Sequence, residues 1–252
     1  MHTIFAFLVI TSGFIAKMSA INLRDELPNL HTCPKLSLQT CLPQSLESMK
    51  PYLMQGVSRL NISSFEPYYV KFQKIDFQNR FVRLMKCRDT LVNGITNFTI
   101  REVNVSDKND YIQFLAYFPF VNVFTKLDPY ALIGSTFIKS SRYDLSSNIT
   151  NVTAEIIIQG ANFEDGENKM QYFSVDNVTV VFRNIGEVFT KKEQKGRGSS
   201  SLTQVANDYF LREWESLTSE LNHYLEDVVA EMIQIISTKI YMHFPIDVLM
   251  TR

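Results

Sequence analysis

The stretch HYLEDVVAEMIQIISTKIY, residues 223–241, contains neither Gly nor Pro. From Val228 to Ile236, apolar side chains point almost all the way round a helix built on this stretch. A helix that is apolar on most of its circumference must be buried on most of its circumference. The stretch therefore predicts a helix that other parts of the protein wrap.

The helical pattern continues on both sides of this stretch. Neither Gly nor Pro occurs from Ser199 to Phe244, and Pro245 follows directly. Apolar residues recur at steps of one, three or four, which predicts one helix of roughly 40 residues and about 60 Å. A coiled coil explains the upstream half, but the apolar arc at 228–236 is wider than a coiled-coil seam. Four polar residues exclude a membrane span: Glu226, Asp227, Glu231 and Gln234.

Residues 61–185 have the period of two that is typical of strands, with turn clusters such as EDGEN at 164–168 between the runs. The alternating runs are YYVKFQKIDF, RFVRLMKC, NFTIREVNV, YIQFLAYF, STFIKS, NVTAEIIIQ and MQYFSVDNVTVVF. A sheet of such long antiparallel strands can curve around a helix. The predicted fold class is α+β, with a strongly curved antiparallel β-sheet wrapped around one long C-terminal α-helix.

Two further segments complete this organisation. Apolar residues recur at helical spacing from Leu38 to Met54, which predicts a shorter N-terminal helix with Thr40 as its N-cap and Gly56 at its end. The charged segment KKEQKGRGSSS at 191–201 predicts a flexible linker between the sheet and the long helix.

The first 20 residues, MHTIFAFLVITSGFIAKMSA, read as a secretory signal peptide. The apolar run from Ile4 to Ala16 is too short to span a bilayer, and the small residues Ser19 and Ala20 follow it. A buried N-terminal strand or a membrane anchor is the alternative. Residues 21–252 then form one domain, and because no other stretch is long and apolar enough, we expect no stable membrane insertion.

Charge argues against nucleic acid as a partner. The chain has 25 Lys and Arg against 26 Asp and Glu, and no basic block beyond KKEQKGR at 191–197. The 19 Phe and 11 Tyr are many for this length, which indicates a large core or an apolar cavity.

Six Asn-x-Ser/Thr sequons agree with secretion. They lie at Asn61, Asn97, Asn104, Asn148, Asn151 and Asn177. On the predicted strands, several of these asparagines alternate with apolar residues, so they lie on the face where a glycan has room.

Three cysteines follow the signal peptide. In an oxidising compartment the simplest arrangement pairs Cys33 with Cys41 and leaves Cys87 unpaired. That pairing would hold the N-terminal segment on the first helix. The four His form no metal-ligating pair, so we expect no metal.

Catalytic signatures are absent from the sequence. It contains no Gly-x-Ser-x-Gly elbow, no His-Glu-x-x-His motif and no phosphate-binding loop. We therefore expect a protein that is not an enzyme and holds no cofactor.

The ordered set of features resembles the insect takeout and haemolymph juvenile-hormone-binding family, whose fold is related to the tubular lipid-binding domains. The similar stretches are TCLPQSLESMKPYLMQGVSRLNISSFEPYYV, VNGITNFTIREV, FPFVNVFTKLDPYALIGSTF and NDYFLREW with HFPIDVLM. The resemblance covers most of residues 21–252 and depends on the whole set rather than on one motif.

The resemblance implies a secreted carrier that holds an elongated hydrophobic small molecule between the sheet and the helix. We expect this carrier to be a monomer. Juvenile hormone, a related terpenoid and a fatty-acid-like lipid all fit. The alternatives are a fully packed interior and a secreted glycoprotein that acts through a protein partner. We chose the expected ligand contacts by the face of the predicted helix or strand on which each residue lies. They are Leu221, Tyr224, Val228, Met232, Phe118, Phe120, Tyr130 and Phe137.

Overall fold

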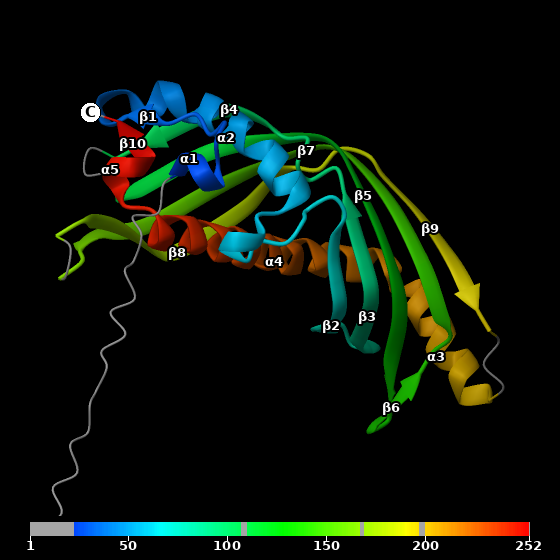
Figure 1. Ribbon diagram of the computed structural model, residues 1–252. Coiled ribbons are helices and arrows are strands. Elements are labelled where there is room, and N and C mark those ends of the chain that lie inside the picture. The colour runs from blue at the N-terminus through cyan, green and yellow to red at the C-terminus, as the bar shows by residue number, and fades with distance from the viewer. Residues whose placement is uncertain (1–22, 107–109, 167–168, 197–199, 252) are drawn as a thin grey trace, which may run out of the picture.

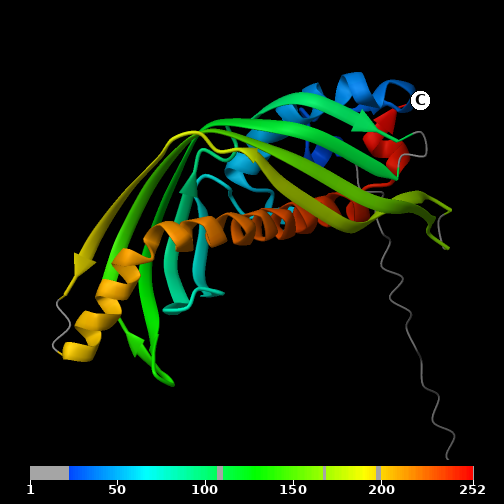
Figure 2. The same cartoon turned by 180° about the vertical axis from the view of Figure 1, so that it is seen from behind.

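The computed structural model describes residues 23–106, 110–166, 169–196 and 200–251. The predicted signal peptide lies outside these ranges. Figure 1 shows an antiparallel sheet that bends strongly over one long C-terminal helix, and Figure 2 shows the same arrangement from behind. The predicted α+β fold class is confirmed. Within the described ranges, no helix combines the length and the apolarity needed to cross a membrane.

Eight antiparallel strands form the main sheet. They are β2 (Tyr68–Asp76), β3 (Val82–Asn93), β4 (Thr99–Val105), β5 (Tyr111–Ile133), β6 (Thr136–Lys139), β7 (Arg142–Glu164), β8 (Gln171–Asn184) and β9 (Val188–Lys195). The path is β2-β3-β5-β7-β8, while β4 and β6 pair with β5 and β9 pairs with β7. The two 23-residue strands β5 and β7 form the centre of the sheet.

One strand occupies a segment that we expected to be a linker. Residues 191–195 belong to β9, which pairs with the first part of β7 from Arg142 to Ile149. Its charged side chains suit a strand at the edge of a sheet, because they discourage pairing with another chain. The linker prediction for these residues is therefore wrong.

Partway along β5 and β7, the buried side chains switch between odd-numbered and even-numbered positions. We call this switch the phase change. On β7 the buried residues are odd-numbered from 143 to 147 and even-numbered from 152 to 158. Asn151, between the two phases, has a left-handed φ of 55°, which Asn tolerates better than most residues. Since a shift of one residue moves every following side chain to the other face, this change keeps an apolar face toward the helices in both halves of the sheet.

The helices lie along the concave side of the sheet. They are α1 (Leu23–Glu26), α2 (Leu38–Gln55), α3 (Ser201–Arg212), α4 (Trp214–His243) and α5 (Ile246–Leu249), with short 3-10 turns η1 (Lys35–Ser37) and η2 (Ser58–Leu60). The N-cap position of α2 is Ser37, not Thr40. The predicted end at Gly56 is confirmed: its φ is 79°, and a Cβ there would lie 2.7 Å from the Ile62 carbonyl oxygen.

The predicted single C-terminal helix is two helices. Glu213 separates α3 from α4 with φ −85° and ψ 1°. Its carboxylate accepts hydrogen bonds from Asn79 and Arg212. α3 packs against β3, β5 and β6, whereas α4 packs against β8. Because these strands diverge along the curved sheet (Figure 1), the helix changes direction without a Gly or a Pro.

Glu66 joins the start of β2 to the turn after β3. Its carboxylate accepts hydrogen bonds from the backbone N–H groups of Gly94 and Thr96 and from the Thr96 hydroxyl, at 2.8 to 3.1 Å. Gly94 has φ 88°, and a Cβ there would lie 2.3 Å from the Phe120 carbonyl oxygen. The Glu66-Pro67 segment and Gly94 are distant in sequence, and together they hold the start of β2 against the turn after β3.

All six sequon asparagines are exposed. The predicted placement on the solvent side is therefore confirmed, and glycosylation of these asparagines stays a prediction.

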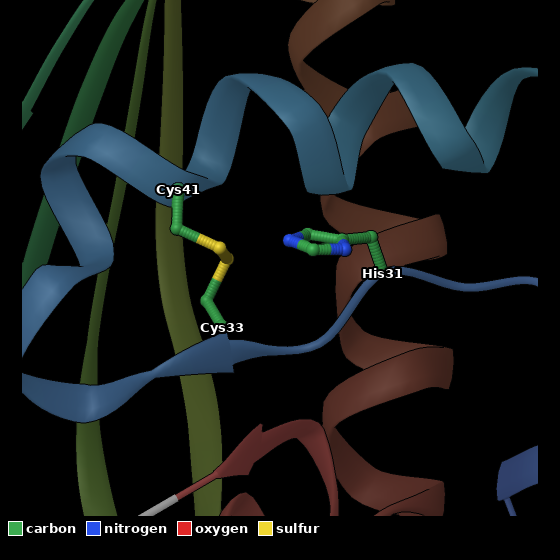
Figure 3. Close-up of side chains that lie close together, drawn as sticks. All are labelled: His31, Cys33 and Cys41. Atoms are coloured by element: carbon green, nitrogen blue, oxygen red, sulfur yellow. A yellow bond between two sulfur atoms is a disulfide. The ribbon is translucent and has the colours of Figure 1, made fainter.

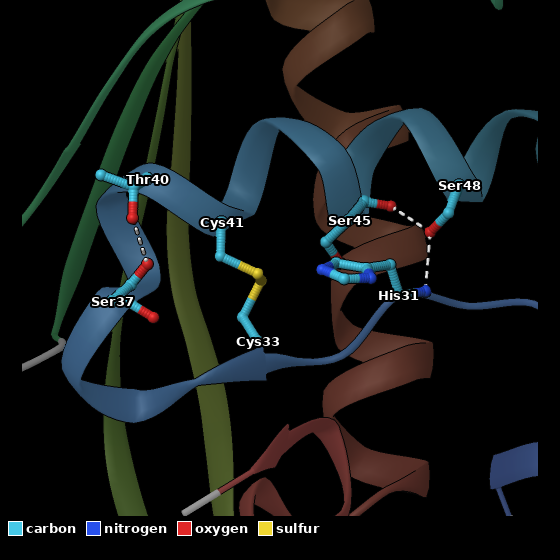
Figure 4. The surroundings of a disulfide bond; sticks show 7 residues. All are labelled: His31, Cys33, Ser37, Thr40, Cys41, Ser45 and Ser48. Carbon is cyan, nitrogen blue, oxygen red and sulfur yellow. Dashed lines mark hydrogen bonds between the residues drawn. A yellow bond between two sulfur atoms is a disulfide. The ribbon is translucent and has the colours of Figure 1, made fainter.

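The disulfide Cys33–Cys41 ties β1 (Cys33–Pro34) to α2. Figure 4 shows a second connection, in which the backbone N–H of His31 donates to the Ser48 hydroxyl and that hydroxyl donates to the Ser45 carbonyl oxygen. β1 also pairs in parallel with β10 (Met250–Thr251). The N-terminal and C-terminal segments therefore meet at the start of α2.

Peptide mapping tests this arrangement. Cys87 is buried, and burial raises the pKa of its thiol to about 12, with the nearby Asp128 carboxylate adding to the shift. Non-reducing digestion should release a peptide pair linked through Cys33 and Cys41. Cys87 should resist alkylation at pH near 8 in the native protein and react after denaturation, because the thiolate is the reactive form. Cys87 bonded to either other cysteine, or reacting equally fast in both states, would contradict the structure.

Candidate functional site

The middle of α4 is apolar but only partly covered by the rest of the protein. We call Thr218–Ile236 the central segment. None of its residues is buried, whereas the flanking Leu217 and Ser237 are. Leu225 and Ile235 are 37% and 47% exposed. The expectation that this helix would be buried on most of its circumference is therefore wrong.

Three core clusters contact the central segment, and none encloses it. Leu221 and Tyr224 pack against the cluster of β2, β3, β5, β7 and α3 that contains Phe210. A second cluster, formed by β4, β5, β7 and β8, packs against Val229, Ala230 and Ile233. A third cluster, at α1 and η2, packs against Met232 and Ile236. The apolar helix thus has neighbours in three directions and residual exposed surface between them.

Polar residues of the central segment attach it to β8. The backbone N–H of Phe182 donates to the Glu226 carboxylate at 2.7 Å. The other carboxylate oxygen of Glu226 lies 3.1 Å from Nδ1 of His223, whose side chain is 87% exposed. This hydrogen bond fixes the helix relative to the sheet edge without filling the space around its apolar residues.

Five of the predicted ligand-contact residues lie on the concave side. Leu221, Tyr224, Val228 and Met232 are half-buried on the central segment. Phe118 packs against the cluster of β4, β5, β7 and β8, and its ring meets that of Phe98 edge-on at 6.1 Å. The structure therefore brings apolar residues of the helix and of β5 to the same side of the sheet.

The other three predicted residues do not join them. Phe120 and Phe137 are 44% and 53% exposed. Tyr130 alternates with the buried Ala131, and Lys86 lies over its ring at 4.9 Å on the convex face. For Phe120 and Tyr130 the phase change within β5 explains this, because a constant alternation from Phe118 wrongly places later even-numbered residues inside. Phe137 lies on β6, opposite Leu132 of β5.

The hydroxyl of Tyr224 is buried and has no hydrogen-bond partner among the described residues. Burial raises the pKa of Tyr224 to about 12, and the nearby Cys87 adds to the shift. The nearby Gln73 side chain acts in the opposite direction and lowers that pKa. A polar atom thus faces the interior from an otherwise apolar stretch of helix.

A pocket of about 140 Å³ lies at the end of the molecule where the two terminal segments meet. Its lining comprises Lys35, Leu38, Val105, Ile112, Asn162, Gln171, Phe173, Tyr241, Ile246 and Met250. The Tyr241 ring packs edge-on against Phe173 at 5.2 Å, and Lys35 pairs with Asp247 at 2.6 Å. Sequence reasoning missed these residues. Tyr241 is the last residue of the apolar stretch at 223–241, and this stretch is the sequence feature from which its place in the lining could have been predicted.

One group of potential metal ligands occurs among the described residues, and Figure 3 shows it as His31 beside Cys33 and Cys41. Both sulfur atoms form the disulfide, so neither offers a thiolate to an ion. One imidazole alone does not make a zinc site. The group therefore does not fit a metal centre.

One solved structure has a fold similar to the one described above. The crystal structure of Takeout 1 from Epiphyas postvittana is similar with a TM-score of 0.69 and 13% sequence identity, covering 88% of this chain and 99% of that chain. A crystal structure of lipopolysaccharide binding protein aligns with a TM-score of 0.40 and 12% identity, covering 80% of this chain and 38% of that one. None of the curated proteins matches the sequence.

The sequence itself matches the model of one protein family over residues 6–251, nearly the whole chain. That match includes both long strands, the central segment of α4 and the terminal segments at the pocket. The chain belongs to the haemolymph juvenile hormone binding protein family.

Proposed function

We propose that this protein is a secreted carrier that holds an elongated hydrophobic small molecule along the central segment of α4. Juvenile hormone, a related terpenoid and a fatty-acid-like lipid are the candidate ligands. The observation that carries the proposal is the incomplete cover of an apolar helix: no residue from Thr218 to Ile236 is buried. The family match and the similar fold of Takeout 1 support the same role.

The energetics favour such a ligand. Removing about 400 Å² of apolar surface from water stabilises a complex by roughly 10 kcal/mol at ~25 cal/mol per Å². Association costs of about 4–15 kcal/mol offset much of this gain. The remaining gain of at most about 6 kcal/mol corresponds to a dissociation constant of tens of micromolar. The carrier would act by sequestration, keeping an apolar molecule out of water during transport.

A glycoprotein that acts through a protein partner is the second candidate. Its support is the edge strand β9, where Val188 and Phe189 are 52% and 63% exposed. Apolar side chains on an unpaired strand edge can bind another chain. The exposed sequons on the sheet fit this candidate as well as they fit a carrier.

Mass spectrometry of protein from eukaryotic culture medium distinguishes the two candidates. For a carrier, organic extraction should release an apolar compound in near-stoichiometric amount, and the native spectrum should show the corresponding complex. The same spectrum should give an N-terminus at Ile21 and glycan masses. A ligand-free spectrum, together with a co-purifying protein, would support the second candidate instead.

Replacement of Val228 by Trp tests the position of the ligand. Because Val228 is half-buried beside uncovered helix surface, the indole of Val228→Trp should occupy the ligand's space while the free energy of unfolding changes by less than about 1 kcal/mol. The affinity for a dansyl-labelled fatty acid should fall at least roughly tenfold, equivalent to about 1.4 kcal/mol.

Val180→Trp is the matched control, since Val180 is 4% exposed in the packed cluster beneath β8. Overpacking there should cost about 1–3 kcal/mol of stability in urea unfolding. If Val228→Trp is destabilised like the control while its folded fraction binds normally, position 228 is ordinary core.

A further inference from the structure

A row of charged side chains crosses the convex face of the sheet, in the half that carries β6 and β9 (Figure 1). Cross-strand partners share one face of a sheet, and the partners here are Lys74 with Lys86, Lys86 with Asp128, and Arg142 with Lys195. An ion pair at 3.3 Å joins Asp128 to Arg142. We call these five residues the basic row. With strands about 4.8 Å apart, the row extends for roughly 19 Å across five strands.

Asp128 organises the centre of the basic row. Its side chain is 4% exposed, and its carboxylate pairs with Arg88, with Lys139 at 3.0 Å and with Arg142. Lys86, its cross-strand partner on β3, adds a further cation. Four cations therefore surround one carboxylate.

The centre of the row keeps a positive charge at neutral pH. Burial acts to raise the pKa of Asp128, but the cations around it outweigh burial and hold that pKa below its ordinary value. The carboxylate is therefore ionised and neutralises one of its four cationic neighbours. At the ends of the row, by contrast, neighbouring acids pair with Lys74 and with Lys195. The excess positive charge is thus concentrated at the centre, in a chain whose formal net charge is −1.

The cations at the centre are able to bind a second anion. Lys139 and Arg142 are 46% and 45% exposed, and Arg88 is 37% exposed. Two guanidinium groups and one ammonium group carry more N–H donors than one carboxylate can accept. Because Asp128 already holds these side chains in place, they lose little conformational freedom when they bind the oxygens of a sulfate or phosphate group.

The shape of this surface favours a chain-like polyanion. A flat bilayer touches a convex face over a small area only, whereas a linear chain can follow a row of cations across several strands. The nearer sequon of β7, Asn148, lies six residues along the strand from Arg142, which is roughly 20 Å. A glycan on Asn148 would therefore be attached well away from the basic row.

We propose that the basic row binds a sulfated polysaccharide, with Lys86, Arg88, Lys139 and Arg142 contacting its sulfate groups. This inference goes beyond the proposed carrier function, because it gives the convex face a partner of its own. A secreted carrier held in this way stays at surfaces that bear such polymers. The helices, on the concave side, remain free to hold a lipid (Figure 2).

The anisotropy of fluorescein-labelled heparin tests this proposal. The wild-type protein should bind heparin in about 50 mM NaCl, and its dissociation constant should rise at least roughly tenfold at about 200 mM NaCl, because salt screens the charges. In Lys139→Gln/Arg142→Gln the dissociation constant should also rise at least roughly tenfold, because two charge-assisted contacts are lost. Asp128 keeps its pair with Arg88 in this variant, so its circular dichroism spectrum should match that of the wild type.

Lys50→Gln/Arg101→Gln is the matched control, since it also removes one Lys and one Arg. Lys50 lies on α2, and Arg101 lies on β4 over the Tyr117 ring at 3.9 Å. β4 pairs with the first part of β5, far along the strand from Asp128. The affinity of the control for heparin should change by less than about twofold, because salt screens charges at that distance.

Two further probes identify the partner. Fully desulfated heparin should not bind, and vesicles of phosphatidylcholine with phosphatidylserine should sediment without the protein. If the vesicles bind the wild-type protein and Lys139→Gln/Arg142→Gln abolishes that binding, the row docks on a membrane and the proposal of a polysaccharide is wrong.

The proposal is also refuted if heparin does not bind the wild-type protein, or if Lys139→Gln/Arg142→Gln and the control bind it equally well. Neither result affects the carrier function. The affinity for a dansyl-labelled fatty acid should be the same in the wild type and both variants, and failure of all three to bind that lipid would count against the carrier alone.

Discussion

An α-helix that is apolar on nearly all sides must be shielded from water, and the fold is organised around that requirement. A flat sheet covers only one side of a helix. Here β5 and β7 are long and bent, and they present apolar residues to α3 and α4 along much of their length. The N-terminal segments cover a third side through η2 and α1. The remaining exposed surface lies along the central segment, and this is where the proposed ligand belongs.

Each end of α4 is held by contacts that the middle lacks. At one end, Phe210 and Leu217 are fully buried against the sheet. At the other, Phe244 is fully buried, and the disulfide, the β1–β10 pair and the Lys35–Asp247 ion pair gather both terminal segments. Two well-packed ends with a less covered middle allow a ligand to fill space there without disturbing the rest of the core.

The sequence predicted what depends on local pattern. The absence of Gly and Pro predicted the C-terminal helices, and the alternation with a period of two predicted the sheet. The short spacing of Cys33 and Cys41 predicted the disulfide. It could not predict what depends on long-range geometry. The break at Glu213 has no local signal, because the directions of the packed strands cause it. Phe120 was misplaced because the phase change in β5 and β7 follows from the bend of the sheet. The unpartnered hydroxyl of Tyr224 depends on residues of two other strands.

Photo-crosslinking with a long-chain lipid that carries an aliphatic diazirine measures most directly whether the uncovered helix surface is the binding site. After irradiation and digestion, we expect adducts on peptides from Thr218–Ile236 of α4 and from the facing residues of β5, and we expect excess unlabelled lipid to abolish them. Adducts confined to the exposed edge at Val188 and Phe189, or labelling that unlabelled lipid does not reduce, would contradict the account.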